Sequence, residues 1–191
     1  MPLALWALTI SAFAVGTTEF VIVGLIPTIA ADLGVSLPSA GLLVSLYALG
    51  VTIGAPVLTA LAGNLPRKKL LLALLTLFIV GNAFAAFAPG YGSLIAARFV
   101  TGLAHGVFVA IASTIATDLV DREKESSAIA TVFLGLTVAL VTGVPFGTWV
   151  GQTFGWHSTF LGVVALGLIG LIASATLVPS NLRRAKAPSL K

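Results

Sequence analysis

The sequence contains very few charged residues for its length. Asp, Glu, Lys and Arg together make up 8% of the 191 positions, whereas about a quarter of a soluble domain is charged. Hydrophobic residues account for 58%, and the mean hydropathy is +1.12. An aqueous fold of this size cannot bury that much apolar surface, so lipid must surround most of the chain.

Cysteine is absent, which excludes disulfides, thiol catalysis and cysteine-ligated metal sites. The sequence also contains no nucleophile elbow, phosphate-binding loop, HExxH motif or carboxylate pair with metal-ligand spacing. We therefore expect no enzymatic activity, no cofactor and no metal. The N-terminus lacks a basic region followed by a small-residue cleavage site, which favours a retained first span over a signal peptide.

Six apolar stretches of about 20 residues or slightly more can each cross a hydrocarbon core of about 30 Å as a helix. The segments that separate them carry turn-forming residues, including glycine, proline, aspartate and asparagine. The sequence predicts an all-α membrane protein with six transmembrane helices. The predicted spans are approximately 3–31, 39–62, 70–88, 92–117, 127–151 and 159–178.

An internal repeat relates the two halves of this chain. Residues 54–59, GAPVLT, match residues 143–148, GVPFGT, at an offset of 89 residues. The same offset carries the first and third spans onto the fourth and sixth. Because each unit has three spans, the second must be inverted in the membrane. We expect a six-span bundle over 1–178, with repeats 3–88 and 92–178, followed by the start of a cytoplasmic loop at 179–191.

The basic residues predict the orientation of the spans. Nine of the ten lie in segments on one side of the predicted membrane: Arg67, Lys68, Lys69, Arg122, Lys124, Arg183, Arg184, Lys186 and Lys191. The positive-inside rule then places both termini in the cytoplasm, and we expect a bacterial inner membrane. The basic balance is therefore a topology signal, and no nucleic-acid partner is expected.

Two charges lie deep inside predicted spans, Glu19 and Arg98. A charge at the bilayer centre costs roughly 2.5–3.5 kcal/mol even on insertion scales, which favours a functional role. His105 shares a helical face with Arg98, and a rise of 1.5 Å per residue puts it at nearly the depth of Glu19. We predict that these three residues couple transport to protons. The alternatives are an arginine that snorkels outward, a protonated structural glutamate, and a histidine that donates to a backbone carbonyl.

Other residues are candidates for helix packing or for a substrate cavity. Small and kinking residues that bring helices close or bend them are Gly50, Gly54, Pro56, Gly63, Arg67 (in the loop after the second span), Gly102, Gly106, Gly143, Pro145, Gly147 and Gly151. Polar side chains that could face a cavity are Thr17, Tyr47, Asn82, Ser113 and Thr142.

Several of these segments resemble the N-terminal half of the major facilitator superfamily, in the drug:proton antiporter branch that includes sugar-efflux permeases. Residues 94–102, LIAARFVTG, are similar to the superfamily's fourth-span motif, whose buried arginine implies proton coupling for Arg98. Residues 143–147, GVPFG, resemble the antiporter fifth-span motif, although Val144 splits the usual Gly-Pro pair. Residues 16–20, GTTEF, are similar to an acidic first-span segment. Residues 63–69 resemble the loop between the second and third spans but lack its aspartate.

The resemblance implies a proton-coupled efflux transporter for small organic molecules, such as sugars, nucleosides or drugs, that works by alternating access. The expected partners are lipid, substrate, protons, and a C-terminal half or a second copy, with a dimer expected for the chain alone. One alternative is a complete six-span protein that pairs with itself as a transporter or channel. Two others are a membrane scaffold and an intramembrane protease, the latter disfavoured because no Ser/His constellation is recognisable.

Overall fold

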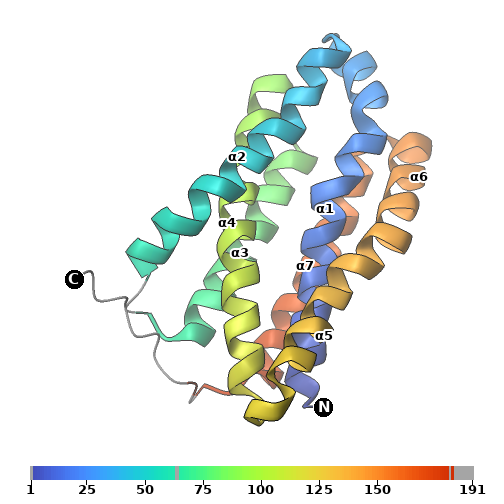
Figure 1. Cartoon of the computed structure of the whole chain (residues 1–191). Coiled ribbons are helices and arrows are strands. Elements are labelled where there is room, and N and C mark those ends of the chain that lie inside the picture. Colours follow the sequence, from blue (N-terminus) through green and yellow to red (C-terminus); the bar gives the residue numbers. More distant parts are fainter. Residues whose placement is uncertain (1, 63–64, 181, 183–191) are drawn as a thin grey trace.

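A computed structural model describes residues 2–62, 65–180 and 182. The described chain is a bundle of long helices joined by short turns (Figure 1). In chain order the elements are α1 (Leu3–Leu33), α2 (Leu37–Ala62), α3 (Arg67–Ala86), α4 (Tyr91–Asp118), η1 (Arg122–Lys124), α5 (Glu125–Val138), η2 (Ala139–Gly143), α6 (Val144–Phe154) and α7 (Trp156–Leu177).

Six helical segments in the described chain are long and apolar enough to cross a membrane. Five correspond to single helices, and the fifth span combines α5, η2 and α6. Most helix ends lie within about four residues of the sequence-based boundaries, where the expected turn residues end each run. The predicted all-α fold with six spans is confirmed.

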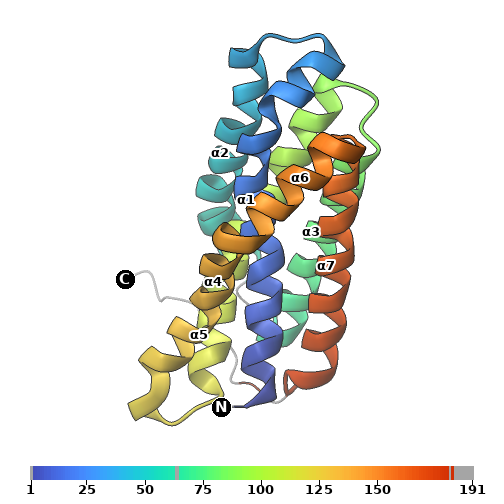
Figure 2. The same ribbon diagram turned by 90° about the vertical axis from the view of Figure 1, so that its right-hand side faces the viewer.

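The helix packing follows the internal repeat. The second span packs most extensively on the fourth (α2 on α4), and the fifth packs in the same way on the first (α5, η2 and α6 on α1). Likewise α3 packs on α4, and α7 packs on α1, while α3 and α7 contact each other. Exchanging spans one to three with spans four to six reproduces these pairs, whereas α6 packs on α7 more extensively than α2 packs on α3 in the described residues. Figure 2 shows the fifth span slanting across α1.

Glycines allow the closest of these approaches. A side chain at Gly50 or Gly54 on α2 would collide with the backbone of α4, and one at Gly102 or Gly106 on α4 would collide with the backbone of α2. These four glycines therefore form reciprocal contact faces. In the fifth span Gly135 likewise faces the backbone of α1 at Thr9. The other three glycines of that span meet side chains of α1 and α7 instead, with Gly143 against Thr17, Gly147 against Val21, and Gly151 against Leu25 and Thr159.

The two repeated prolines have different local structures. Pro145 lies in the first turn of α6, which follows the π-helical turn η2 directly, and the backbone N–H of Val144 bonds to the carbonyl of Ala139 five residues earlier. A π-turn accommodates proline because the proline lacks an N–H and its ring crowds the carbonyl four residues before it. Pro56, in contrast, lies inside α2, which is assigned as one uninterrupted α-helix.

One end of the bundle gathers the loop charges that the structure describes. The Arg67 guanidinium at the start of α3 forms an ion pair with Asp118 at the end of α4. Lys68 donates to the carbonyl of Ala175 near the end of α7 over 2.7 Å. Arg67 thus has a carboxylate partner from α4 although the loop lacks the aspartate of the family pattern. Gly63 lies outside the described residues.

Candidate functional site

Glu19 lies in the middle of α1, beside residues that are fully buried. Val15, Val21 and Ile22 on the same helix have no exposed surface, whereas the Glu19 side chain is 29% exposed. The carboxylate therefore sits at the edge of the packed core and not within it. A solute that approached this part of α1 could therefore reach the Glu19 carboxylate.

Arg98 is directed inward from α4 and is only 1% exposed, so it does not snorkel to the membrane surface. Its Nη1 atom donates to the carbonyl of Thr18 over 2.8 Å, and Nη2 donates to the carbonyl of Glu19 over 3.5 Å. The guanidinium carbon lies 4.0 Å from the centre of the Tyr47 ring, which is the geometry of a cation–π contact. Arg98 thus links α4 to the backbone of α1 and to an aromatic face of α2.

The Arg98 guanidinium holds backbone carbonyls and no carboxylate. Among the residues that the structure describes, no Asp or Glu oxygen lies within 4.0 Å of it. Its Nε atom is buried without a hydrogen-bond partner. Arginine carries five N–H donors, so this side chain retains unused donor capacity next to Glu19.

His105 lies between Tyr47 and Glu19. Its Nδ1 atom lies 3.0 Å from the Tyr47 hydroxyl and 3.9 Å from Oε2 of Glu19. The helix face that carries Arg98 also carries His105, and Tyr47 comes from the facing turn of α2. Glu19, Tyr47, Arg98 and His105 therefore form one cluster across α1, α2 and α4.

This arrangement can transfer and hold a proton. Imidazole both accepts and donates at neutral pH, and its Nδ1 atom faces a phenol and a carboxylate at once. If the phenol donates to Nδ1, the neutral ring carries its proton on Nε2. If Nδ1 carries the proton, the carboxylate of Glu19 is the nearest acidic acceptor. In the described part of the chain, no group of three His, Cys, Asp or Glu residues could hold a metal ion.

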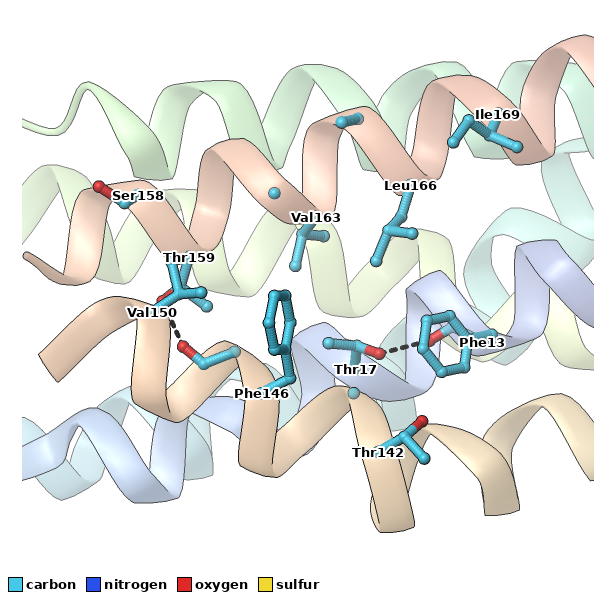
Figure 3. Close-up of a pocket in the computed structure, with 14 residues that line it drawn as sticks. Phe13, Thr17, Thr142, Phe146, Val150, Ser158, Thr159, Val163, Leu166 and Ile169 are labelled. Carbon is cyan, nitrogen blue, oxygen red and sulfur yellow. Dashed lines mark hydrogen bonds between the residues drawn. The ribbon is translucent and has the colours of Figure 1, made fainter. Parts of the chain in front are cut away.

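The other polar candidates lie outside this cluster. Asn82 is 1% exposed and faces the helix core, so it does not line a cavity as we had expected. Ser113 is half-buried on α4, eight residues beyond His105. Thr17 and Thr142 line a separate cavity of about 430 Å³ between α1, the fifth span and α7, where Phe146 also lies (Figure 3).

The threonine hydroxyls that line this cavity are already bonded to backbone carbonyls. Thr17 donates to the carbonyl of Phe13 and Thr142 to that of Val138, both over 2.8 Å. Thr159 donates to the carbonyl of Gly147 over 2.7 Å. Ser158 donates to the carbonyl of Phe154 over 3.0 Å. Since the other lining residues are apolar, this cavity offers a solute little to recognise, and the expected substrate role of Thr17 and Thr142 lacks geometric support.

Sequence reasoning missed Thr18, which the structure places at the centre of the site's hydrogen bonds. Its carbonyl accepts from Arg98, and its hydroxyl donates to Oδ1 of Asn82 over 2.7 Å. The only sequence signal was its position next to Glu19. A backbone carbonyl contact can be made by any residue type, so no side-chain pattern in the sequence predicts it.

Comparison with known proteins agrees with this fold. The Major Facilitator Superfamily model matches residues 8–191. The chain belongs to the Major Facilitator Superfamily. It corresponds to the N-terminal half of such transporters, and it spans about half the length of the curated relatives that it matches.

Three of these relatives are bacterial. The chain is 56% identical to YtbD, an uncharacterized MFS-type transporter of Bacillus subtilis (strain 168), over 95% of this chain and 46% of the relative. It is 45% identical to YdhP, an inner membrane transport protein of Escherichia coli (strain K12), over 93% of this chain and 46% of the relative. It is 39% identical to a chloramphenicol resistance protein of Streptomyces lividans, over 98% of this chain and 48% of the relative.

A crystal structure of the peptide transporter POT has the same fold. The match has a TM-score of 0.82 and covers 98% of this chain and 42% of that chain, at 14% sequence identity. At this identity the likeness concerns the fold alone. The family consists of membrane transporters and not of enzymes, as expected, and the chain corresponds to the N-terminal half of one.

Proposed function

We propose that the chain is the N-terminal half of a proton-coupled exporter of small organic molecules in a bacterial inner membrane, with both termini in the cytoplasm. The substrate would pass between two six-span bundles that rock about a site near the membrane midplane. The candidate substrates are sugars, nucleosides and drugs, and the name of the Streptomyces relative makes chloramphenicol the first compound to test. The required partner is a C-terminal half or a second copy of the chain.

The observation that supports this proposal most directly is the environment of Glu19. Its carboxylate is part-exposed at the edge of the core, and the Nδ1 atom of His105 lies 3.9 Å away. A membrane-embedded carboxylate with an imidazole beside it can take up a proton from one side and release it when the site faces the other. Arg98 and Tyr47 hold this pair in place from α4 and α2.

The test requires a transport-competent protein. The chain would be joined to the C-terminal half of the Bacillus relative and assayed in inside-out vesicles with chloramphenicol, a nucleoside and arabinose as probes. We expect at least one probe to accumulate when the vesicle interior is acidified, and its accumulation to release protons. The Glu19→Gln variant should insert normally but should no longer use the proton gradient.

The same assay separates His105 from Glu19. His105→Asn keeps a polar group beside Tyr47 but cannot bind a proton, so we expect it to shift the pH dependence of transport more than it lowers the maximum rate. Thr52→Val is the control, because Thr52 is exposed on α2 and its hydroxyl bonds to its own helix at Ala48. Transport by Glu19→Gln with the parental dependence on the gradient would remove Glu19 from the proposed mechanism.

A further inference from the structure

Thr18 differs from neighbouring hydroxyl residues on α1. Ser11 and Thr17 donate to the backbone carbonyls of Ala7 and Phe13, four residues earlier, over 2.9 and 2.8 Å. This is the usual way in which a hydroxyl is satisfied inside a membrane helix. The Thr18 hydroxyl instead donates across the helix interface to Oδ1 of Asn82 on α3, over 2.7 Å.

The amide of Asn82 is oriented to accept this hydrogen bond. It is 1% exposed, and its Nδ2 atom donates to the carbonyl of Phe78 over 2.8 Å. Since Phe78 offers only an acceptor at that point, the amide nitrogen must face it and the amide oxygen must face Thr18. The orientation of the amide is thus fixed by its own helix, and its oxygen is presented to α1.

Thr18 is consequently held from two sides. Its hydroxyl is bound by Asn82 of α3, while its carbonyl accepts from Nη1 of Arg98 on α4 over 2.8 Å. The rest of α1 is fixed by packing on the fifth span and α7, whereas these two hydrogen bonds fix the turn that carries Thr18 against α3 and α4. The next residue is Glu19, whose carboxylate position relative to His105 depends on the placement of that turn.

We infer that Asn82 is a positioning residue that sets the protonation equilibrium of Glu19 through its hydrogen bond to Thr18. This inference rests on the proposed proton role of Glu19, and it gives that site a component from α3, outside the cluster itself. Without the bond, the Thr18 hydroxyl can turn to the carbonyl of Ala14, as its neighbours do. The helix then stays satisfied, but the turn of α1 that carries Thr18 and Glu19 loses its hydrogen bond to α3 and keeps only those from Arg98.

The titratable groups that face Glu19 in the described structure are Arg98 and His105 from α4 and Tyr47 from α2. Asn82 and Thr18 carry no charge, so their removal can affect Glu19 only by moving it relative to these groups. The Glu19 carboxylate lies 3.9 Å from Nδ1 of His105. If the ring is protonated, moving the carboxylate by about 1 Å changes the interaction of these two unit charges enough to shift the protonation midpoint of Glu19 by about half a pH unit, which is roughly a threefold change in its protonation equilibrium.

The test measures protonation of Glu19 directly, without transport. Dicyclohexylcarbodiimide enters the membrane, where a protonated carboxyl adds across its C=N bond and rearranges to a stable N-acylurea with no leaving group. The purified 191-residue chain in detergent is treated at a series of pH values, and labelling of the peptide that contains Glu19 is measured by mass spectrometry. The midpoint of labelling against pH is the readout.

We expect Asn82→Leu and Thr18→Val to move this midpoint in the same direction by about half a pH unit or more. The double variant should match the single variants, because both remove one bond. Thr18→Ser retains the hydroxyl and should behave like the parent. Ser174→Ala is the matched control: it removes a buried hydroxyl contact of 3.3 Å between α1 and α7, at Ser11, away from Arg98.

Helicity and elution volume establish that each variant is folded, and Thr18→Val and Asn82→Leu test the same bond from opposite partners. Parental midpoints in both folded variants would overturn the inference, as would an equal shift in Ser174→Ala or in Thr18→Ser. Failure of the proposed function would give a different result. Glu19→Gln would then transport as the parent does, while the labelling midpoint still reports whether Asn82 positions Glu19.

Discussion

The hydroxyl oxygen of Tyr47 lies 3.0 Å from Nδ1 of His105, in a part of the bundle where both residues are buried. Because Tyr47 also lies beneath the Arg98 guanidinium, one side chain contacts both basic members of the site. The hydroxyl acts on the histidine and the ring acts on the arginine. These two contributions can be separated by substitution.

Tyr47→Phe should affect the histidine alone, since it removes the hydroxyl and keeps the aromatic face beneath Arg98. We expect a loss of about 0.5–1.5 kcal/mol, the net value of one hydrogen bond, together with a changed pH dependence of transport. Tyr47→Leu should cost more, because it also removes a buried cation–π contact of about 2 kcal/mol. Thermal unfolding of the purified variants and the vesicle assay measure the two effects. Equal effects of both substitutions would show that the ring contributes nothing, and a Tyr47→Phe variant that behaves like the parent would show that the hydroxyl contributes nothing.

Substitution of Arg98 should disturb the attachment of α4 to α1. Lysine places one compact ammonium where the planar guanidinium reaches two carbonyls, so Arg98→Lys should retain only part of the proton-coupled transport. Arg98→Ala should abolish it while the protein still inserts. Full activity of Arg98→Ala at a normal membrane level would contradict a role for this link. The matched comparison is Lys69→Ala, which removes a basic residue that is exposed at the start of α3.

The α2–α4 contact should tolerate no added methyl group. A side chain at Gly102 meets the backbone carbonyl of Tyr47 and the Cα atom of Gly50, neither of which can move aside as a side-chain end could. We expect Gly102→Ala to destabilise the bundle by roughly 1–3 kcal/mol. Gly162→Ala on α7 is the control, because a Cβ atom there has nothing within 4 Å. A lower melting temperature for Gly102→Ala and none for Gly162→Ala is the expected result.

The orientation of the chain can be tested with single cysteines, because the parent sequence contains none. Gly92 lies in the first turn of α4 with open space around it, and Glu123 is exposed in η1, before α5. By the positive-inside rule Glu123→Cys should face the cytoplasm and Gly92→Cys the opposite side. An impermeant maleimide added to intact cells should label only Gly92→Cys. Labelling of both from one side would refute the six-span topology.

The sequence predicted the fold well because its main signals are physical requirements of the membrane. Lipid forces each apolar run of sufficient length into a helix, so six runs give six helices. The approach of Glu19 and His105 was also predictable, since the rise per residue places both at nearly the same depth. The inverted repeat then restricts which spans can be neighbours.

The partners of the polar residues were less predictable. Each span is apolar on all sides, so periodicity does not reveal which face is inward. Asn82 was expected to face a cavity, yet it shares the core face of α3 with Leu71, Leu75 and Phe78. Arg98 binds the backbone carbonyls of Thr18 and Glu19, and carbonyl partners have no sequence signature.

The last prediction is that this chain folds alone but does not transport alone. Its two buried apolar clusters are completed by its own helices, one toward each end of the bundle, and the glycine faces of α2 and α4 are satisfied by each other. We therefore expect the purified chain to be helical and monodisperse in detergent. Its α2 and fifth span remain largely exposed, however, and the part-exposed carboxylate of Glu19 lies at the edge of the core.

An exposed polar site is costly in lipid unless it is covered, and a substrate path between two bundles needs a second wall. These two requirements predict that the chain pairs with a second copy. We expect the pair to be inactive in proteoliposomes, because two N-terminal halves do not form the substrate path that an N-terminal and a C-terminal half form together. Light scattering in detergent measures the mass, and fusion to the C-terminal half of a relative should restore both the monomeric state and activity. Substrate-specific, proton-coupled flux from the unfused chain would overturn this prediction and establish the self-pairing six-span transporter, because one bundle would then supply both walls of the path.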